Sequence, residues 1–410
     1  MKKFLVFLIS TFIVVGLLSG CGSSDANNTD DLSGKTIVVG RWGGNDAETA
    51  AFNKMVAEFT KKTGIKVEQR IYSDYNMELQ VELIGGTAPD VFYVDAYMAP
   101  FFIEQGVLLE LDYDEFELDK FYQPLTNAFI KDGKVYAVSK DYSTLALYYN
   151  KKYVNAEEIP DTLEELWTSD FLTNLKAKLP SGMAAMTYNQ DLARKMFIAQ
   201  GGGVSIVRDE IYSNLSDPKI VENLTPLFEA AKEGKLVTPQ DLGVGWNGDA
   251  FGNEKTAMMI EGNWVLGFLE QNFPEVEFGV IEVPTFRGEK GTMVFTVGYG
   301  IYSKSKEVEA AKEFIKFATG TEGMAIWTKG AGVLPSRADV AEAIGVMDDQ
   351  RKVPHILGAE YATPWQKGTT LDTINNEFRN YIPSVVKGER TLAEALKIAE
   401  EEANKIIRQN

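Results

Sequence analysis

The sequence has one cysteine and one histidine among its 410 residues. A disulfide or a zinc cluster of thiolates needs a second cysteine, so neither can form within the chain. A Ser-His-Asp hydrolase would depend entirely on His355, and the sequence contains no Gly-x-Ser-x-Gly motif. The scarcity of histidine also disfavours a metal site, with a tyrosine-rich iron site as the residual exception. We therefore expect no metal, no cofactor and no catalysis of the Ser-His-Asp or thiol type.

Basic residues are also in the minority. The chain has 41 Lys and Arg against 59 Asp and Glu, which gives a formal net charge of −18. Such a surface repels nucleic acid and anionic lipid, so we expect no nucleic-acid partner. Hydrophobic residues make up 45% of the chain and aromatic residues 11%, which is ample for packed cores. The length favours two lobes over a single domain.

The apolar run at the N-terminus is too short to span a membrane. It covers residues 4–18 behind a basic start, whereas a transmembrane helix needs about 20 residues. Together with the small residues that precede Cys21, this segment resembles a bacterial lipoprotein signal. The resemblance implies that residues 1–20 form a signal peptide, that Cys21 is the lipid anchor carrying a palmitate-type chain, and that residues 21–35 form a flexible tether. A plain cleaved signal with a chance cysteine is the alternative.

The folded part begins with a strand–helix–strand pattern. Residues 36–40 are apolar and β-branched, residues 52–59 repeat apolar side chains at helical spacing, and a second strand begins at residues 65–67. This order predicts two parallel strands joined by a helical crossover. Ligands collect at the carboxyl ends of such strands, so Trp42 is a candidate site residue. Packing of Trp42 on its own lobe is the alternative.

Residues 85–153 contain two short apolar strands with polar neighbours. The strands are expected at Val91–Val94 and Leu145–Tyr149, and a polar block at residues 139–144 precedes the second strand. The neighbours that we expect to line a ligand cleft are Asp95, Tyr97, Asp141, Tyr142 and Ser143. The polar block is also where we expect the chain to cross between lobes. An Asp-Gly turn at residues 132–133 predicts a hairpin shortly before it.

Later segments are dominated by helical patterns. The final helix is expected to begin after Thr391, whose hydroxyl would form a capping box with Glu394. Asn189 opens an expected helix over residues 189–200, where its amide would be available to a ligand. Trp327 lies in a helical apolar pattern, so we assign it to the core.

Two glycine-containing segments supply further candidates. Trp246 lies in residues 243–248, which match Gly-x-Gly-x-x-Gly, but no strand precedes the motif and no strand–helix–strand unit surrounds it. We therefore reject dinucleotide binding and keep Trp246 as a candidate aromatic platform. Gly298 and Tyr299 lie on an expected strand over residues 294–302, where a glycine lets the backbone approach a ligand.

Five sequence stretches carry information through the order in which they occur along the chain. They are GGTAPDVFYVD, DGKVYAVSKDYSTLALYYNKKY, AFGNEKTAMMIEGNW, YSKSKEVEAAKEFIKFATGTEGMAIW and GVLPSR, and together they span most of residues 36–410. In this order they resemble the extracellular solute-binding proteins of carbohydrate ABC transporters, relatives of maltose- and maltodextrin-binding proteins. Each stretch alone is weak evidence, and the combination carries the resemblance.

The resemblance implies an α/β, two-lobed fold of the periplasmic-binding-protein type (type II-like), with a ligand cleft between the lobes and three hinge crossings. The implied lobes are an N-lobe of residues 36–141 plus 294–337 and a C-lobe of residues 142–293 plus 338–410. The implied crossings are residues 139–144, 291–295 and 337–351.

The same resemblance implies a sugar site. It places Trp264 as the main aromatic platform and Trp365 in a late segment of the site. Sugar rings stack on aromatic faces, and carboxylates accept hydrogen bonds from sugar hydroxyls. Maltodextrin-type relatives have a glutamate where this chain has Ser143, so maltodextrin specificity is not implied.

The implied function is a receptor at the extracytoplasmic face of the bacterial cell membrane, attached only through its N-terminal lipid. It would capture a sugar or oligosaccharide by hinge closure and deliver it to the permease subunits of an ABC importer, and we expect a monomer. One alternative keeps the fold but binds a phosphate ester, polyamine or sugar acid; Arg41 and Lys140 lie near expected strand ends where they would meet an anion. Another is a surface glycoside hydrolase, which needs two carboxylates at a defined separation. The five stretches belong to a non-catalytic fold, so the resemblance implies that the protein is not an enzyme.

Overall fold

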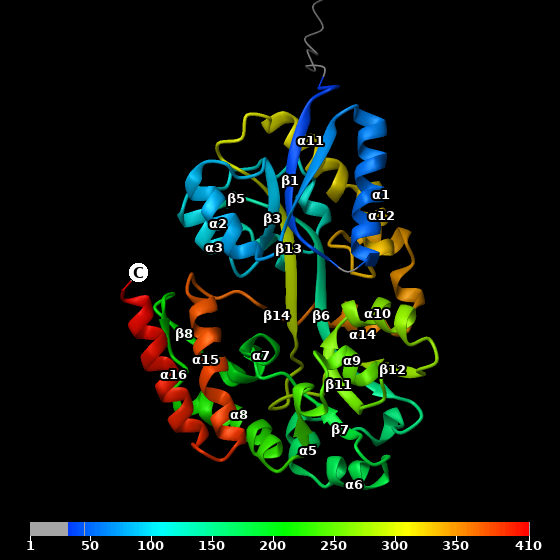
Figure 1. Ribbon diagram of the computed structural model, residues 1–410, viewed down its shortest axis with the longest axis vertical. Coiled ribbons are helices and arrows are strands. Elements are labelled where there is room, and N and C mark those ends of the chain that lie inside the picture. Colours follow the sequence, from blue (N-terminus) through cyan, green and yellow to red (C-terminus); the bar gives the residue numbers. More distant parts are fainter. Residues whose placement is uncertain (1–31, 45, 410) are drawn as a thin grey trace, which may run out of the picture. The chain divides into compact units, whose positions relative to one another are not determined.

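The computed structural model describes residues 32–44 and 46–409 (Figure 1). The predicted signal peptide, Cys21 and most of the predicted tether lie outside the described residues. The segment Leu32–Asn410 forms one compact unit. Within the described residues, no helix has both the length and the apolarity needed to cross a membrane.

The strands and helices alternate along the chain, as expected for an α/β fold. The strands are β1 (Thr36–Trp42), β2 (Lys66–Tyr72), β3 (Val91–Asp95), β4 (Ile130–Lys131), β5 (Lys134–Val135), β6 (Val138–Asn150), β7 (Ala184–Thr187), β8 (Val207–Arg208), β9 (Tyr212–Ser213), β10 (Leu236–Val237), β11 (Thr256–Gly262), β12 (Phe278–Ile281), β13 (Met293–Ile301) and β14 (Thr363–Pro364).

The α-helices are α1 (Asp46–Thr63), α2 (Tyr75–Gly85), α3 (Ala99–Glu104), α4 (Gln123–Asn127), α5 (Leu163–Thr168), α6 (Phe171–Lys178), α7 (Met196–Ala199), α8 (Pro218–Lys232), α9 (Asn247–Gly252), α10 (Trp264–Asn272), α11 (Val308–Thr319), α12 (Thr321–Ala331), α13 (Ala338–Ala343), α14 (Val353–Gly358), α15 (Leu371–Val386) and α16 (Leu392–Ile407). The 3₁₀ turns are η1 (Leu118–Lys120), η2 (Ala156–Glu158), η3 (Leu192–Arg194), η4 (Gly201–Gly203), η5 (Gln240–Leu242) and η6 (Val346–Asp348).

One main sheet runs through the whole compact unit. Its strand order is β10-β7-β11-β6-β13-β3-β1-β2, with β12 paired to β6 and β14 paired to β13. Figure 1 shows β6 and β13 side by side at the centre, where they pair antiparallel. These two strands therefore link the two halves of the sheet.

The local predictions for the first half hold. β1 and β2 pair in parallel around α1, from Thr36↔Lys66 to Trp42↔Tyr72, which confirms the crossover unit. The Asp-Gly turn joins β4 to β5 in an antiparallel hairpin, as predicted. The helix α16 begins with the predicted capping box between Thr391 and Glu394. These features are encoded by neighbouring residues, which is why the sequence alone reveals them.

Two hydrophobic cores cover opposite faces of the first half of the sheet. Helices α1, α11 and α12 cover one face, where Phe52, Phe59 and Phe314 are at most 1% exposed. Helices α2 and α3 cover the other, around Phe92 and Phe102. We use the name N-lobe for the elements of these two cores.

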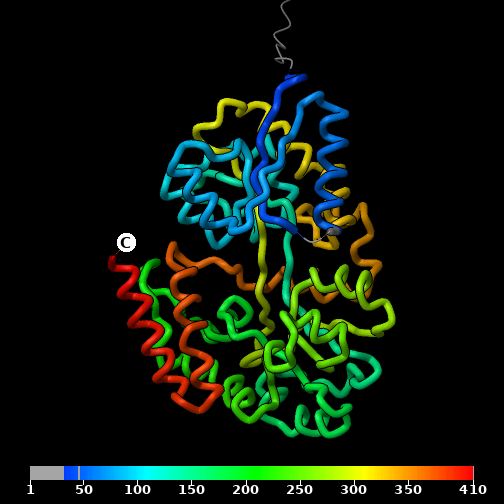
Figure 2. The backbone as a smooth tube through the Cα atoms, viewed as in Figure 1, coloured from blue at the N-terminus to red at the C-terminus, as the bar shows by residue number. Residues whose placement is uncertain are grey.

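The second half of the sheet is covered in the same way, and we use the name C-lobe for it. A large core packs α5, α6, α8, α15 and α16 around Trp167, Phe228 and Phe378, and a smaller one packs α9 and α10 around Phe251. Figure 2 shows that α15 and α16, from the end of the chain, lie beside α8, and these helices are in contact. Coverage of both faces explains why strands such as β3, β7 and β12 are nearly continuous apolar runs.

Two sequence-based expectations need correction. The polar block at residues 139–144 is not a break between strands, because it lies inside β6, whose thirteen residues are all buried. Its polar side chains are satisfied by partners far along the chain: Ser139 Oγ lies 2.7 Å from Thr296 Oγ1, and Thr144 Oγ1 donates to His355 O at 2.7 Å. Tertiary pairing thus overrides the local polarity.

The second correction concerns the helix expected over residues 189–200. The structure has the 3₁₀ turn η3 followed by the short helix α7, with a non-helical Lys195 (φ −140°) between them. The ammonium group of Lys195 turns inward and donates to the backbone carbonyls of Asn189 (2.6 Å) and Asp191. Because the Lys195 side chain binds these two carbonyls, they do not accept the backbone hydrogen bonds of a regular helix, and that helix does not form.

Candidate ligand-binding site

The centre of the molecule is marked by a β-bulge in β6. Asp141 pairs with Val297 and Ser139 pairs with Gly298, so Lys140 is the extra residue on its strand. A bulge re-aims a side chain relative to the regular alternation. Here it brings the Lys140 ammonium group onto the Asp141 carboxylate, and the two side chains are 4% and 9% exposed.

Aromatic rings surround this ion pair. The indole Nε1 of Trp327 donates to Asp141 Oδ2 at 2.6 Å. The Lys140 ammonium lies 4.2 Å from the ring centroid of Trp327 and 4.7 Å from that of Tyr93. Burial alone would lower the pKa of Lys140, but the neighbouring Asp141 carboxylate outweighs it and holds that pKa above its ordinary value. The Lys140 ammonium group therefore stays charged at neutral pH.

A pocket of about 220 Å³ opens beside the ion pair, and we name it the tryptophan pocket. Its wall combines the carboxyl end of β1, the bulge of β6, the start of α10 and helix α12. The residues that line it are Arg41, Trp42, Glu48, Tyr93, Lys140, Asp141, Ser143, Trp264, Phe295, Val297, Trp327 and Val333. N-lobe and C-lobe residues thus contribute to one cavity.

The aromatic wall is held in place by ring contacts from both lobes. Trp42 packs edge-on against Tyr75 and Tyr93, with ring centroids 5.1 Å and 4.8 Å away. Trp264 packs edge-on against Phe295 at 5.8 Å, and Trp264 is only partly buried. Rigid aromatic walls with a few fixed polar groups are the usual make-up of a small-molecule site.

A network of polar side chains lies behind Trp264. The Glu261 carboxylate, 1% exposed, accepts from Asn189 Nδ2 at 2.8 Å and from Asn247 Nδ2 at 3.1 Å. Arg194 forms an ion pair with the same carboxylate at 3.5 Å, and its guanidinium lies 5.6 Å from the Trp264 ring. The predicted residue Asn189 therefore holds the Glu261 carboxylate, which pairs with Arg194, and does not line the tryptophan pocket.

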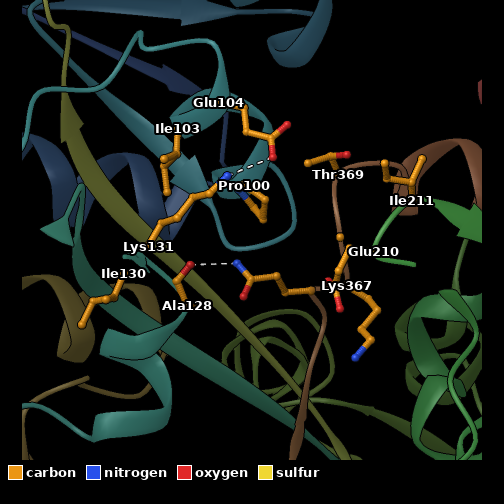
Figure 3. A pocket seen from close by; sticks show the side chains of 12 residues that line it. Pro100, Ile103, Glu104, Ala128, Ile130, Lys131, Glu210, Ile211, Lys367 and Thr369 are labelled. Atoms are coloured by element: carbon orange, nitrogen blue, oxygen red, sulfur yellow. Dashed lines mark hydrogen bonds and ion pairs between the residues drawn. The ribbon is translucent and has the colours of Figure 1, made fainter. Parts of the chain in front are cut away.

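A second opening, the side groove, lies near the end of β3 and has a volume of about 520 Å³ (Figure 3). It is bordered by α3, the β4–β5 hairpin, the β8–β9 hairpin and the segment after β14. Gln366 Nε2 donates to Ala96 O at 2.5 Å and to Ala128 O at 2.7 Å. These two bonds tie the segment after β14, which packs on the C-lobe through Trp365, to the N-lobe backbone.

Asp95 and Tyr97 lie at the carboxyl end of β3, as predicted, but line neither cavity. Asp95 Oδ1 accepts from the backbone N–H of Tyr97 at 3.2 Å, and burial raises the pKa of Asp95 to about 7. The Tyr97 hydroxyl accepts from Asn76 Nδ2 at 2.6 Å. The Tyr97 ring packs on both the N-lobe and the C-lobe cores, so it bridges the two.

Other predicted site residues lie away from the tryptophan pocket. Tyr142 is 1% exposed and packs edge-on against Tyr122, because regular alternation along β6 places it on the side opposite Asp141. Tyr299 is also 1% exposed and packs in the N-lobe core on Tyr93 and Phe314. These two tyrosines are core residues in this structure.

The remaining predicted residues also serve packing. Trp365 is 7% exposed in the C-lobe core, and Trp246 packs on Phe268 with ring centroids 4.7 Å apart. A Cβ on Gly298 would lie 3.0 Å from Ala137 Cβ and 3.1 Å from Val138 O. The close approach at Gly298 is therefore that of its own partner strand, where we had expected a ligand.

The structure brings four predicted residues together in the tryptophan pocket: Trp42, Asp141, Ser143 and Trp264. Sequence reasoning placed Trp327 only in the core, and it is indeed 5% exposed, yet its indole N–H also holds Asp141. It did not single out Phe295 or Glu48. It named Lys140 only as a cation that would meet an anionic ligand, and not as the partner of Asp141. Among the described residues there is no group of three or more His, Cys, Asp or Glu placed to hold a metal ion.

Curated relatives match this chain along its length. The diacetylchitobiose binding protein DasA of Streptomyces coelicolor is 24% identical over 436 residues, covering 100% of both chains. The galactooligosaccharide-binding protein of Bacillus subtilis is 22% identical, covering 98% of this chain and 96% of that protein.

Solved structures share the fold. An ABC substrate-binding protein of Listeria monocytogenes in complex with cycloalternan aligns with a TM-score of 0.78 at 24% identity, over 91% of this chain and 99% of that one. The sugar-binding protein MalE from Xanthomonas citri aligns with a TM-score of 0.78 at 18% identity, over 92% and 98%. These similarities confirm the predicted α/β fold class.

The family assignment follows from the central part of the sequence. Residues 54–354 match the family described as bacterial extracellular solute-binding protein, and they make up more than half of the chain. Proteins of this family bind solutes and are not enzymes, in agreement with the sequence-based expectation. The chain belongs to the bacterial extracellular solute-binding protein family.

Proposed function

We propose that this protein is a lipid-anchored receptor that captures a sugar or oligosaccharide and delivers it to an ABC importer. The observation that carries the proposal is the tryptophan pocket, in which indole rings stand beside a fixed carboxylate. The relatives support the ligand class, because DasA binds diacetylchitobiose and the Bacillus subtilis relative binds galactooligosaccharide.

The pocket suits the two kinds of surface of a sugar ring. Trp264 and Trp42 offer apolar faces for the C–H side of the ring, and they come from different lobes. Asp141 and Ser143 offer oxygen atoms to the hydroxyls at the ring edge. Because charge-assisted hydrogen bonds are the stronger ones, the Asp141 carboxylate would contribute most of the polar binding energy.

The two cations of the pocket argue against an anionic ligand. Lys140 is paired with Asp141, and Arg41 donates to Gln69 Oε1 at 2.9 Å and to Trp42 O at 3.0 Å. An acidic ligand would have to compete for groups that already have partners. We therefore propose a neutral carbohydrate over a phosphate ester or a sugar acid.

We further propose that the lobes are residues 36–141 plus 294–337 and residues 142–293 plus 338–410, joined by three hinge segments. The N-lobe core of the structure also includes Val340, just past the proposed boundary. Ligand bound to one lobe would draw in the other, and closure would shield the polar contacts from water.

Lipid attachment at Cys21 is a separate part of the proposal. It rests on the lipoprotein-like segment before the folded part, and it is tested by expressing the full chain and a Cys21→Ala variant in bacteria with labelled palmitate. We expect label and membrane association only with Cys21 present. Equal labelling of both proteins would contradict the anchor.

The ligand is tested by calorimetric titration of the purified protein with a series of mono- and oligosaccharides. Glycerol phosphate and spermidine serve as non-sugar controls, and a saccharide should bind with both released heat and a higher unfolding temperature. Binding of a control but of none of the saccharides would overturn the ligand class.

Two tryptophan variants locate the site. Trp264→Ala should weaken binding of the identified saccharide by at least about tenfold, because it removes an aromatic platform in the pocket. Trp246→Ala is the matched control, since it removes a C-lobe tryptophan that packs on Phe268 and does not line the pocket. A larger loss with Trp246→Ala than with Trp264→Ala would place the site elsewhere.

A further inference from the structure

A cavity of about 40 Å³ lies inside the C-lobe, apart from the tryptophan pocket and the side groove. Its wall is partly apolar, with Phe197, Ile198 and Leu227 among its residues. The cavity is large enough for one small ligand of the size of a water molecule or a halide ion.

Several polar side chains line this C-lobe cavity without a visible partner. Within the described residues, the atoms Trp167 Nε1, Thr187 Oγ1 and Arg194 Nε have no hydrogen-bond partner, although all three are buried. Trp167 and Thr187 are 2% and 0% exposed. Buried polar atoms are almost always satisfied in folded proteins, so three of them around one cavity indicate a bound species.

Lys195 also lines the cavity. It is 2% exposed, and its ammonium group donates to the carbonyls of Asn189 and Asp191, which uses two of its three hydrogens. Burial lowers the pKa of Lys195 to about 8, so the group is still mostly protonated at neutral pH. The ammonium group therefore places a positive charge at the cavity wall.

The wall carries more donors than acceptors, and its side-chain acceptors are neutral: the hydroxyls of Thr187 and Tyr188 and the amide oxygen of Asn189. Trp167 and Arg194 offer N–H groups that can only donate, Lys195 has a third N–H, and Thr187 has a hydroxyl. Among the described residues that line the cavity, none is acidic. A water molecule needs acceptors for its own two hydrogens, whereas a monovalent anion needs only donors. Donor chemistry and positive charge therefore favour an anion.

We propose that this cavity is a binding site for a small monovalent anion of the halide class, held by Trp167, Thr187, Arg194 and Lys195. The anion would contact the remaining N–H of the inward-turned ammonium group at the break between η3 and α7. It would also fix Arg194, whose guanidinium reaches Glu261 and the Trp264 ring. The site does not depend on the sugar-binding proposal, because it is a separate cavity.

Thermal unfolding tests the site. The purified protein is unfolded in sodium chloride, sodium bromide or sodium gluconate at the same ionic strength, since gluconate is too large for the cavity. Chloride and bromide should raise the unfolding midpoint by a few degrees over gluconate, with a rise that saturates with concentration, because a ligand of the native state stabilises it by mass action. Equal midpoints in all three salts would overturn the proposal.

Conservative variants connect the effect to the cavity. Thr187→Val and Trp167→Phe each remove one donor and keep most of the side-chain shape, so each should reduce the halide-dependent rise by half or more. Thr126→Val is the matched control, because Thr126 Oγ1 in α4 is likewise buried without a partner among the described residues and does not line this cavity. A full halide response in both cavity variants would contradict the assignment.

A crystallographic measurement keeps the test decisive if a variant fails to fold. Crystals of the unmodified protein grown in bromide should show an anomalous scattering peak within hydrogen-bonding distance of Trp167 Nε1 and Lys195 Nζ. The bromide concentration should be high enough to saturate halide sites of other proteins in solution. Density for a water molecule at this position, with no anomalous peak, would then overturn the proposal.

Discussion

Lys140 and Asp141 are consecutive residues of β6 whose side chains nevertheless form a buried ion pair. Successive side chains of a regular strand point to opposite faces, so this contact exists only because the bulge opposite Val297 and Gly298 interrupts the alternation. The same bulge sets the position of the carboxylate in the tryptophan pocket. The geometry of the proposed sugar site is therefore tied to one irregularity in strand pairing.

Removal of one partner of the Lys140–Asp141 ion pair should lower the free energy of unfolding. Lys140→Met leaves the Asp141 carboxylate buried beside Trp327, and we expect a loss of about 3 kcal/mol in the free energy of unfolding. The measurement is urea denaturation at neutral pH. Lys134→Met is the control, because Lys134 pairs with Glu110 at the surface, where each side chain is 52% exposed, and should cost less than about 1 kcal/mol. Equal losses in the two variants would show that the pair is not buried in solution.

Gly298→Ala should destabilise the protein through the bulge. The added methyl group would approach Ala137 Cβ and the Val138 carbonyl at 3.0 Å and 3.1 Å, and backbone cannot move aside easily. We expect a loss of about 1–3 kcal/mol by urea denaturation. Gly267→Ala in α10 is the matched control: apart from the local helix backbone, no atom of the described residues lies within 4 Å of its added methyl group, so alanine should be neutral or stabilising. Changes in the free energy of unfolding of the same sign and size for the two substitutions would contradict this explanation.

Asp95 predicts a particular dependence of stability on pH. Its pKa of about 7 in the folded protein exceeds the ordinary value of 3.8, so the folded state retains a proton that the unfolded state has released. Stability should therefore fall as pH rises from about 4 to about 7. Asp95→Asn removes this term, and above pH 7 the variant should be more stable than the parent by roughly 1–3 kcal/mol. Parallel stability curves from pH 5 to pH 8 would refute the shift.

His355 gives a direct spectroscopic test, because it is the only histidine of the sequence. Its side chain is 0% exposed, Nδ1–H donates to Thr144 O at 2.8 Å, and Nε2 accepts from the Tyr148 hydroxyl at 2.8 Å. Burial lowers the pKa of His355 to about 4 from 6.5. The unfolded state therefore binds the proton first, and the stability that neutral His355 contributes should be lost as pH falls from about 6.5 to about 4.

The measurement for His355 is proton NMR of the imidazole ring across this range. We expect one histidine signal that does not titrate between pH 8 and pH 5. A midpoint near pH 6.5 in the folded protein would show that the ring is solvated, and would contradict its burial between β6 and α14.

Local patterns were sufficient for much of the fold. The parallel β1–α1–β2 unit, the hairpin at residues 132–133 and the capping box at Thr391 depend on residues close together in the sequence. The candidate residues at strand ends were found by the same logic. Trp42 does end β1 and Asp95 does end β3, as the alternation of strands and helices predicts.

The parts that could not be predicted depend on pairing between distant segments. The bulge at Lys140 requires the register of β6 against β13, which no local pattern contains. The same register decides that Tyr142 and Tyr299 face cores while Ser143 faces the pocket. The irregular backbone at Lys195 depends on an inward-turned ammonium group, whereas helix propensity alone favours a continuous helix.

β6 has a consequence for any attempt to divide the protein. Its first residues pack in the N-lobe core and its later residues in the C-lobe cores, as Val138 and Leu147 illustrate. A recombinant fragment that ends within β6 would leave one half without its central strand. We therefore expect that neither lobe folds autonomously when expressed alone, and that the two halves behave as one cooperative folding unit.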